Sequence, residues 1–600
     1  MRLPLIPFPK TLEMHEGKFV WPTDPGIKPE SLLAWVADRD SRLTLDGDHA
    51  VQILHDTELE DSNYKLVVEP NLITISTGSK SGLQNAARTL VQLFEHSAEI
   101  ECLCIEDGPR FGWRGAMLDP SRHFLPLPWI LKFVDLMSML KLNRLHLHLC
   151  DDQGWRIEIK KYPKLTEIGG VRRATPWAPG SDDHDDTPHG GYYTQAELRS
   201  LVDYAAERGI VVMPEIELPG HATSALAAYP ELANHNRPIE TSIRYGVHDD
   251  IYNVEDATLR FLEDVLEEVL DIFPSEFIHI GGDEVPKTQW KASEAAQQRM
   301  QQEGLANEDE LQSWFIKHFD RWLANRGRRL VGWDEILEGG LAPGATVMSW
   351  RGMEGGIAAA TAGHDVVMCP VQHCYFDHYQ TAFKSGEPTA IGGNLPLSKV
   401  YAFEPVPSSL DESAARHVLG GQANFWSEYM RTTDQVEYMA LPRLLALSEV
   451  LWGKPDPDSF EEFLSRVEPV LRCLSEKGYR FRPLSPEVPD YFLNIGNWAV
   501  GDLSGDERLL NFAVNQMVSV GDEILAQYMG GAWSVEFSSP SFFYVDGTTI
   551  ESEHDGRTGN FDRNNRIKVP QSGVLKSISL KMKSVGDGDT TGTIYLVKNG

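Results

Sequence analysis

The feature that most constrains the fold is a series of eight short apolar segments between Phe111 and Trp452, most of them separated by amphipathic stretches. Short apolar runs that alternate with helical patterns predict buried parallel strands joined by helices. Eight strand–helix units over about 340 residues favour a (β/α)8 TIM barrel, an α/β fold, over an open doubly wound sheet. The predicted strands are Arg114–Leu118, Arg144–Leu149, Ile210–Ile216, Phe277–Ile280, Leu330–Gly332, Thr346–Ser349, Val366–Cys369 and Gly420–Phe425.

The segments on either side of this series have different patterns of predicted secondary structure. Before it, strands are predicted at Tyr64–Val68 and Leu72–Ser76 and a helix at Ser81–Phe94, which indicates a small α+β domain. The turn-rich segment Glu106–Arg110 marks its end. After it we expect helices and then β structure, with an incomplete final module as an open alternative. The predicted tail elements are helices Phe460–Lys477 and Glu507–Tyr528 and strands Phe542–Val545, Val574–Lys583 and Thr593–Lys598.

These patterns divide the chain into three predicted domains. Residues 1–108 form the N-terminal α+β domain, residues 109–485 form the barrel with C-terminal helices, and residues 486–600 form a helical and β-rich module. A chain of 600 residues has room for several domains, at roughly 100–200 residues each. The role of the last module stays open.

Charge and composition exclude several classes of partner. The chain carries 55 Lys and Arg against 88 Asp and Glu, a formal net charge of −33. Nucleic acids and anionic lipid surfaces attract clustered cations, so neither is an expected partner. No stretch approaches the about 18 apolar residues of a membrane span, and prolines interrupt the first ten residues, where a signal helix needs a sustained apolar run. We therefore expect a cytoplasmic protein, or one exported with a leader that this chain does not contain.

Metal and nucleotide motifs are missing from the sequence. Six cysteines without a Cys-x-x-Cys pair suggest neither a disulfide scaffold nor a zinc site. No Gly-x-Gly-x-x-Gly follows a predicted strand, and no phosphate-binding Gly-x-x-x-x-Gly-Lys-Ser/Thr occurs. We expect no metal and no cofactor.

Polar and aromatic residues follow the predicted strands where each strand ends. In a (β/α)8 barrel these positions and the loops after them meet at one face and form the active site. One carboxylate after a strand is more often a helix cap or a solvated residue, but here all eight strands are followed by polar or aromatic residues. They are Asp119, Arg122 and His123; His146, His148, Asp151 and Asp152; Glu215, Glu217 and His221; Asp283 and Glu284; and Trp333, Trp350, Tyr375, Asp377, Trp426 and Glu428.

The residue types at this face indicate a sugar ligand. Three Trp and one Tyr can cover the apolar C–H face of a sugar ring, while carboxylates and Arg122 bind its hydroxyl groups. Within this set, Gly281-Gly-Asp283-Glu284 is the most specific motif. The glycines allow a close approach of the backbone to a ligand, and mutual repulsion of the two carboxylates tends to raise one pKa into the range of a general acid.

Two adjacent carboxylates on one strand are an unusual glycosidase pair. Standard glycosidases place the two groups across the scissile bond, about 5–5.5 Å apart in retaining and about 6.5–9.5 Å apart in inverting enzymes. Neighbours on one strand diverge, so Glu284 can protonate the leaving group while Asp283 needs another role. In substrate-assisted enzymes the acetamide of the sugar itself attacks the anomeric carbon. Asp283 would then orient the acetamide N–H.

These residues together resemble glycoside hydrolase family 20, the β-N-acetylhexosaminidases. The resemblance runs from about Arg110 to Trp452 and extends to the N-terminal domain. The motifs that carry it, in order, are Trp113–Phe124, His146–Arg156, Pro214–His221, His279–Glu284, Val331–Trp333, Ser349–Trp350, Tyr375–Asp377 and Trp426–Glu428. The implied activity is exo-acting, retaining removal of terminal β-linked GlcNAc or GalNAc from glycans or chitooligosaccharides through an oxazolinium intermediate.

The resemblance also implies a role for each matched residue. Glu284 would be the general acid/base and Asp283 the carboxylate that orients the acetamide. Tyr375 would hydrogen-bond the acetamide carbonyl, and Asp151 and His221 would form a relay behind Glu284. The sugar-binding residues would be Trp333, Trp350 and Trp426, which line the pocket, and Arg122, Asp377 and Glu428, which bind hydroxyl groups.

Two other functions stay open from the residues. A metal-dependent TIM-barrel hydrolase could use His146 and His148 on one strand face, with His221, Asp151 and Asp283 completing the ligands. That alternative leaves the Trp residues unexplained. A non-catalytic sugar-binding protein would account for the aromatic residues, but it has no need of the carboxylate pair.

Some properties do not follow from the sequence. The acidic loop 181–186 is interpreted as solvated, although it could border the sugar site. The preference for GlcNAc or GalNAc, the linkage and the oligomeric state, with a homodimer as one alternative, stay open.

Overall fold

The computed structural model describes residues 3–597 in two compact units, except for short gaps. The first unit comprises residues 3–376 and 397–482, and the second comprises residues 377–396 and the chain from residue 483 onward. The gaps are residues 23–42, 46–47, 96, 180, 182, 382–383, 385–386, 485–491, 501–507, 521, 532–533, 553–555, 560–565 and 586–589. The predicted boundary at residue 485 therefore lies outside the described residues.

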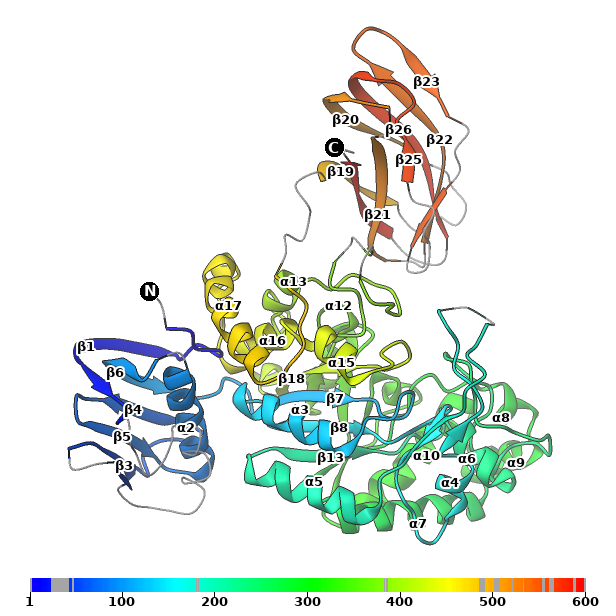
Figure 1. Ribbon diagram of the computed structural model, residues 1–600. Helices are drawn as coiled ribbons and strands as arrows, with labels where there is room; N and C mark the ends of the chain where they lie inside the picture. The colour runs from blue at the N-terminus through cyan, green and yellow to red at the C-terminus, as the bar shows by residue number, and fades with distance from the viewer. Residues whose placement is uncertain are drawn as a thin grey trace. The chain divides into compact units, whose positions relative to one another are not determined.

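Eight parallel strands close into a barrel in the first unit (Figure 1). Their order around the barrel is β13-β14-β15-β16-β17-β18-β7-β8, so each strand lies beside its neighbour in the sequence. The strands are β7 (Trp113–Leu118), β8 (Arg144–His148), β13 (Val211–Glu215), β14 (Phe277–His279), β15 (Arg329–Trp333), β16 (Thr346–Ser349), β17 (Val366–Met368) and β18 (Val418–Phe425). All eight predicted strands and the TIM-barrel fold are thereby confirmed.

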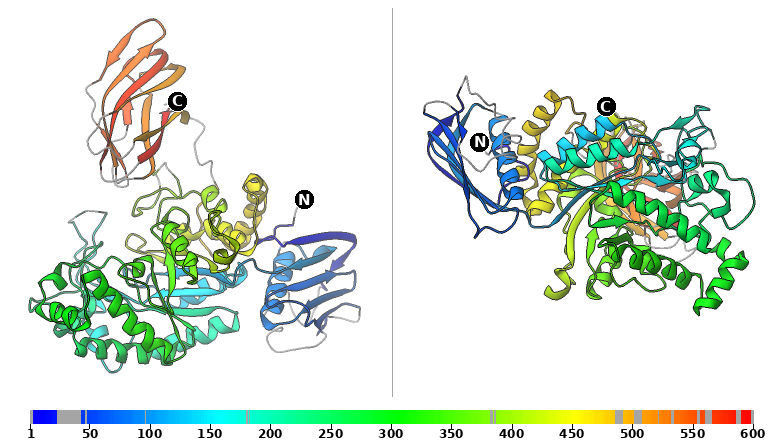
Figure 2. Two further views of the ribbon diagram at one scale, coloured as in Figure 1. Left: turned by 180° about the vertical axis from the view of Figure 1, so that it is seen from behind. Right: turned by 90° about the horizontal axis from the view of Figure 1, so that it is seen from below.

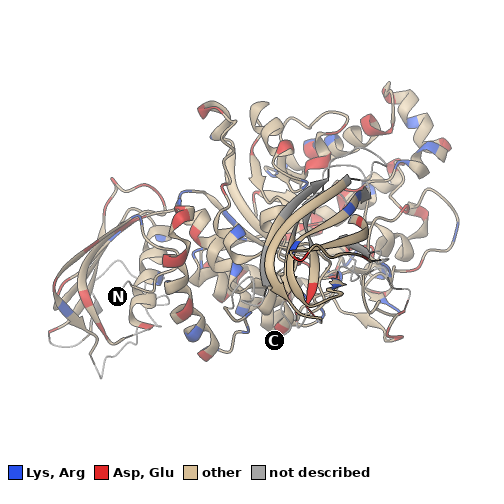
Figure 3. Cartoon of the chain, turned by 90° about the horizontal axis from the view of Figure 1, so that it is seen from above, with Lys and Arg blue, Asp and Glu red and all other residues tan. Residues whose placement is uncertain are grey.

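Helices cover the outside of the barrel (Figure 2). The longest are α3 (Leu127–Met139), α5 (Gln195–Glu207), α7 (Asp256–Ile272), α10 (Glu308–Ala324) and α17 (Phe460–Glu476); shorter ones include α6 (Thr223–Ala228), α9 (Glu294–Glu303), α11 (Glu354–Thr361), α15 (Thr433–Ala440) and α16 (Arg443–Trp452). Helix α5 begins at a capping box, in which Thr194 Oγ1 accepts the Glu197 N–H and Glu197 accepts the Thr194 N–H. In Figure 3, acidic and basic residues are interspersed along these helices.

The N-terminal part of the first unit is a small α+β domain, as predicted, and its described residues include a six-stranded sheet and a helix. The strand order is β1-β6-β4-β5-β3-β2, and helix α2 (Lys80–Glu95) packs against the apolar core of the sheet. The other side of α2 faces the barrel helices: Gln84 donates to the Glu207 carbonyl, Arg88 to Ser138 Oγ and Gln92 to the Met139 carbonyl. The strands are β1 (Thr11–Val20), β2 (Leu43–Thr44), β3 (Ala50–His55), β4 (Tyr64–Val68), β5 (Leu72–Thr77) and β6 (Glu99–Asp107).

A buried ion pair joins this domain to the barrel. Lys141 Nζ lies 3.2 Å from Asp107 Oδ2, and both side chains are at most 1% exposed. Asp107 also accepts hydrogen bonds from the Tyr64 hydroxyl and from Trp452 Nε1. A buried charge is tolerated only with such partners, so these four residues hold the sheet, the first barrel strands and helix α16 together.

The second unit contains two antiparallel sheets around an apolar core. One sheet has the order β19-β27-β21-β25, and the other has β20-β26-β22-β23 with β24 paired to β22. The strands are β19 (Phe492–Val500), β20 (Arg508–Val518), β21 (Glu523–Gly531), β22 (Ser534–Tyr544), β23 (Thr549–Glu551), β24 (Gly556–Gly559), β25 (Arg566–Lys568), β26 (Gly573–Val585) and β27 (Thr590–Val597). The three strands predicted in the tail fall within β22, β26 and β27, apart from Val545, which follows β22, and Lys598, which lies outside the described residues.

The predicted helix at Glu507–Tyr528 is wrong. Strands β20 and β21 occupy this segment, and Glu507 lies outside the described residues. The apolar residues of this stretch fit a helical spacing as well as an alternating one. In the structure, alternate residues enter the core, with Phe512 and Val514 on β20 and Ile524 and Ala526 on β21. Pairing with β26 and β27 therefore decides the local conformation.

Among the described residues, no helix has the length and apolar character needed to cross a bilayer.

Candidate functional site

The carboxylate pair lies directly after β14, at the C-terminal end of the barrel strands. His221 Nε2 is 3.5 Å from Glu284 Oε2 and 3.7 Å from Asp283 Oδ2. Asp283 is buried, whereas the Glu284 side chain is 35% exposed. The site therefore has an accessible carboxyl group and a sheltered one, both beside a single imidazole.

The backbone at this pair is held in an unusual conformation. Glu284 and His221 have φ of 49° and 47°, in the left-handed region that few non-glycine residues adopt. Such strain persists only where the surroundings enforce it, and it concentrates at functional sites. The two strained residues are the two that meet across the site.

His221 contacts two aspartates, Asp152 in addition to Asp151, with which the sequence predicts a relay. His221 Nδ1 lies 3.4 Å from Asp151 Oδ1 and 3.2 Å from Asp152 Oδ2, and the hydrogen bond is to Asp152. Asp152 is fixed by the backbone N–H and hydroxyl of Thr223. Burial lowers the pKa of His221, but the negative charge of Asp151 and the contacts with Asp151, Asp152 and Glu284 outweigh this effect and raise it well above its usual value. The surroundings of His221 therefore favour its protonated form beside Glu284.

Burial raises the pKa of several carboxyl groups around the pair. The pKa of Asp283 rises to about 6, because the group is desolvated and Glu284 is close. Burial and then Asp283 raise the pKa of Glu217 well above its usual value and that of Glu335 to about 8. Clustered carboxyl groups with displaced pKa values are typical of catalytic sites.

The two glycines before the pair are needed for packing against side chains inside the protein. We expected them to allow close approach of a ligand. A Cβ on Gly281 would instead stand 1.6 Å from Glu217 Oε2, and one on Gly282 would stand 2.6 Å from Ile336 Cγ2. Both have positive φ, 67° and 91°, so they combine tight packing with a turn that other residues rarely adopt.

Aromatic side chains pack together next to the pair. The rings of Trp333 and Trp426 are 5.6 Å apart, and those of Trp350 and Tyr375 stack at 6.0 Å. Tyr375 and Trp426 are 6.3 Å apart, which joins the two pairs into one group. Trp333 is 1% exposed, whereas Trp350 and Trp426 are partly exposed. The four predicted aromatic residues thus lie together.

Carboxylates fix the orientation of two of these indoles. Trp333 Nε1 donates to Glu215 Oε1 over 2.9 Å, and Trp350 Nε1 donates to Glu335 Oε2 over 2.9 Å. Glu215 is itself surrounded by His146, His148 and His279 at 2.5–3.0 Å. Hydrogen bonds to Glu215 and Glu335, and the histidines around Glu215, therefore fix the positions of these two indoles.

Arg122 has several partners in the protein and lies against Trp426. Its guanidinium contacts Asp151 at 2.7 Å and Asp119 at 3.1 Å, and it lies 5.1 Å from the centre of a Trp426 ring. Glu428 Oε1 is 4.0 Å from Arg122 Nη1. Arg122 and Glu428, for which the sequence predicts hydroxyl binding, thus lie close together, and we call them the polar wall of the candidate site. Asp377 is buried and is the first residue of the second unit.

The ligand set proposed for a metal hydrolase is divided between different groups. His146 and His148 both contact Glu215, and Asp151 and Asp283 lie on opposite sides of His221. The described residues do contain four groups of three potential ligands, such as His146, Glu215 and His279. In that group Glu215 already accepts hydrogen bonds from Trp333 and histidine side chains, as expected for a structural network.

Sequence reasoning assigned no role to Asp152, Glu217 or Glu335. Each of the three is buried, and each interacts electrostatically with Asp283 or His221. Their positions in the sequence could have indicated a role. Asp152 follows Asp151 directly, and Glu217 and Glu335 lie two residues after Glu215 and Trp333.

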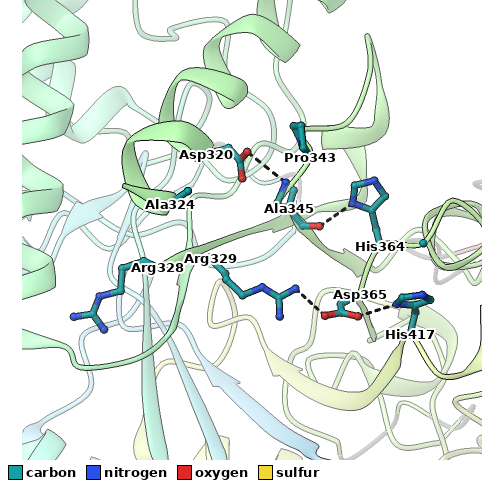
Figure 4. Close-up of a pocket in the computed structure, with 11 residues that line it drawn as sticks. Asp320, Ala324, Arg328, Arg329, Pro343, Ala345, His364, Asp365 and His417 are labelled. Carbon is teal, nitrogen blue, oxygen red and sulfur yellow. Dashed lines mark hydrogen bonds and ion pairs between the residues drawn. The ribbon is translucent and has the colours of Figure 1, made fainter. Parts of the chain in front are cut away.

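A cavity at the opposite end of the barrel has a different character (Figure 4). It encloses about 330 Å3 at the N-terminal ends of β15–β18. Arg329 pairs with Asp365 at 2.7 Å, Asp365 contacts His417 at 3.0 Å, and His364 contacts the Ala345 carbonyl. Arg329, Asp365 and His417 thus contact one another, and Asp320 and His364 contact backbone groups, which indicates a structural role.

The acidic loop is partly structural. Asp183 and Asp186 are exposed, as predicted, but Asp185 accepts the backbone N–H groups of Thr175 and Thr187. Asp182 lies outside the described residues.

Comparison with known proteins covers most of the chain. The family model "Glycosyl hydrolase family 20, catalytic domain" matches residues 111–455, and "Glycosyl hydrolase family 20, domain 2" matches residues 2–108. A beta-hexosaminidase of Porphyromonas gingivalis is 45% identical over 455 residues, which are 74% of this chain and 57% of that protein. A beta-hexosaminidase of Vibrio furnissii is 35% identical over 74% of this chain and 76% of its own length.

Solved structures give the same result. The GH20 exo β-N-acetylglucosaminidase of Vibrio harveyi in complex with N-acetylglucosamine has a TM-score of 0.69 and 32% identity, covering 80% of this chain and 78% of that one. The chain spans little more than half the length of the Porphyromonas relative but over three quarters of the Vibrio proteins.

Proposed function

This chain belongs to glycoside hydrolase family 20, and we propose that it is an exo-acting β-N-acetylhexosaminidase. Its substrates are glycans or chitooligosaccharides with a terminal β-linked N-acetylhexosamine. The named relatives support this activity, and one similar structure holds N-acetylglucosamine. The observation that carries the proposal is the sheltered Asp283 beside the accessible Glu284, with His221 between them and the aromatic group next to them.

The first chemical step uses the acetamide of the substrate as nucleophile. The acetamide oxygen bonds to the anomeric carbon while the glycosidic C–O bond breaks, and Glu284 gives its proton to the leaving oxygen. Asp283 accepts the acetamide N–H and stabilises the positive charge of the oxazolinium ring. Its burial keeps this carboxylate away from water, so the interaction is stronger than at a surface.

The second step returns the enzyme to its starting state. Glu284, now ionised, takes a proton from a water molecule, and the oxygen of that water bonds to the anomeric carbon as the oxazolinium opens. Two displacements at one carbon retain its configuration. His221 stays charged beside Glu284 and stabilises the ionised form between the steps.

The surrounding residues bind and orient the sugar. Trp333, Trp350 and Trp426 cover its apolar faces, and Tyr375 donates to the acetamide oxygen. Arg122, Glu428 and Asp377 bind ring hydroxyl groups. Contacts to Glu215 and Glu335 hold two of the indoles in place before the substrate arrives, which lowers the entropy lost on binding.

Hydrolysis of chromogenic β-glycosides tests the proposal. We expect release of 4-nitrophenol from the β-GlcNAc or the β-GalNAc glycoside, release of GlcNAc from chitobiose, and strong inhibition by a thiazoline mimic of the oxazoline. Binding of these sugars without turnover would favour a sugar-binding protein. Activity that is lost on exhaustive chelation and restored by a metal would favour the metal-dependent alternative.

A further inference from the structure

One loop of the first unit brings a tyrosine to the polar wall of the sugar site. Tyr245 lies between the 3-10 helix at Pro230–Leu232 and α7, and its ring packs edge-on against Tyr429 at 5.4 Å. Tyr429 directly follows Glu428 in the sequence. Tyr245 is therefore anchored, through its ring, to the segment that carries Glu428.

The backbone of the same loop is tied to Arg122. The Arg244 carbonyl accepts a hydrogen bond from Gln153 Nε2 over 2.7 Å, and Gln153 Oε1 accepts one from Arg122 Nε over 2.9 Å. The loop thus contacts Tyr429 and Gln153, which are the neighbours of Glu428 and Arg122. The charges of Arg172, Glu428, Arg431 and Arg122 act on the Tyr245 hydroxyl.

Two buried polar atoms at this wall have no hydrogen-bond partner among the described residues. They are the hydroxyl oxygen of Tyr245 and Oε2 of Glu428. A buried polar atom left unsatisfied costs about 1–3 kcal/mol, and a buried tyrosine hydroxyl usually finds a partner. The phenol could donate to a carboxylate, yet the structure shows no hydrogen bond between the two. Burial raises the pKa of Tyr245 to about 12, so the phenol keeps its proton at neutral pH.

A sugar hydroxyl satisfies both atoms at once, because it accepts one hydrogen bond and donates another. We propose that Tyr245 is a specificity-determining residue, whose O–H donates to a hydroxyl of the bound sugar while that hydroxyl donates to Glu428 Oε2. This inference rests on the proposed function and adds a residue that sequence reasoning did not assign. Discrimination of this kind is strong, since a substrate without the hydroxyl leaves two buried groups unpaired.

The molecule provides a matched control. The Tyr252 hydroxyl is also buried and without a hydrogen-bond partner among the described residues. Tyr252 is 0% exposed, and its charge interactions are with Cys150 and Asp152, whereas those of Tyr245 include Glu428 and Arg122. Tyr252→Phe removes the same atom from a position without a charge interaction with Glu428 or Arg122.

The test combines Tyr245→Phe with substrates that lack one hydroxyl. We measure kcat/KM on the chromogenic β-GlcNAc glycoside and on its 3-deoxy, 4-deoxy and 6-deoxy analogues. Tyr245→Phe should lower kcat/KM on the parent glycoside by about 3- to 10-fold, the effect of one neutral hydrogen bond. On one of the deoxy analogues the variant and the wild type should agree within about twofold, because the bonded hydroxyl is already missing. Tyr252→Phe should match the wild type on all four substrates.

Several outcomes would overturn the inference. One is an equal loss for Tyr245→Phe on all four substrates, and another is no loss on the parent glycoside. A lower melting temperature, or failure of the variant to fold, would show that the hydroxyl has a partner in the free protein, since removing an unsatisfied hydroxyl should not destabilise it. Failure of the proposed function is distinct, because the wild type would then hydrolyse none of the glycosides.

Discussion

The two ends of the barrel use the same kinds of side chain in opposite ways. At the C-terminal end, Asp283 and Glu428 each have a buried oxygen without a partner among the described residues, and Glu284 has a strained backbone. At the N-terminal end, Asp365 is bound by Arg329 and His417 (Figure 4). Burial raises the pKa of Asp283, whereas hydrogen bonds from His417 and Arg329 outweigh burial and lower that of Asp365.

The difference separates a reactive end from a stabilising end. A carboxylate whose partners are all present in the free protein contributes to stability and has nothing left for a ligand. A carboxylate without partners lowers stability and is available to substrate. One barrel therefore carries both uses on opposite ends of the same strands, as expected for this fold.

The largest expected effect is at Glu284. Glu284→Gln removes the proton donor and should lower kcat on a substrate with a poor leaving group by about 10²–10⁴-fold. The measurement is steady-state hydrolysis of chitobiose. Asp365→Asn is the matched control at the other end and should keep kcat within about twofold. An equal loss of kcat in both variants would contradict the proposed difference between the two ends of the barrel.

The next effect is the pH dependence of activity. Ionised Asp283 accepts the acetamide N–H and stabilises the oxazolinium charge much more strongly than the protonated group does, and its pKa is raised to about 6. In the wild type, kcat/KM should fall about tenfold per unit as the pH drops below 6. An acid limb near pH 4 would show that Asp283 is not desolvated in the way the structure indicates.

Stability should respond in opposite directions at the two ends. The pKa of Asp283 in the folded state is raised from the ordinary 3.8 to about 6. Above pH 6 the buried carboxyl group is ionised, and this lowers the free energy of unfolding. Asp283→Asn should therefore raise the free energy of unfolding at pH 7.5, by at most about 3 kcal/mol, and leave it nearly unchanged at pH 4. Denaturant unfolding at both pH values measures this, and a lower stability of the variant at pH 7.5 would contradict the account.

The smallest expected effect is at Asp365. Its lowered pKa means that the ionised group stabilises the fold at neutral pH, and that this contribution is lost as the pH falls through the folded-state pKa. Asp365→Asn should cost about 1 kcal/mol at pH 7.5 through the weakened contacts to Arg329 and His417. A stabilising effect at pH 7.5 would remove the distinction between the two ends.

The sequence predicted the barrel well because each strand is a short apolar run between helical patterns. It failed at Glu507–Tyr528, where both periods fit and only the pairing partners β26 and β27 decide. Phe512 and Val514 lie on the same face of β20, and this alternating pattern favours a strand only when the face packs into an apolar core.

The site was predictable in part. Residues at strand ends could be gathered at one face, since strand polarity places them there. The partner of His221 was not determined, because Asp151 and Asp152 are adjacent and a difference of 0.2 Å separates their contacts. The use of the Gly281 space by Glu217, and the missing partners of Tyr245 and Glu428, depend on side-chain packing that spacing does not encode.

The most direct test of the central claim changes the nucleophile in the substrate. We compare wild-type kcat/KM on the chromogenic β-GlcNAc glycoside with that on its N-trifluoroacetyl analogue. Fluorine withdraws electrons from the carbonyl oxygen, so substrate assistance predicts a fall of at least about tenfold. Equal rates on the two substrates, with a covalent glycosyl–carboxylate adduct, would contradict it.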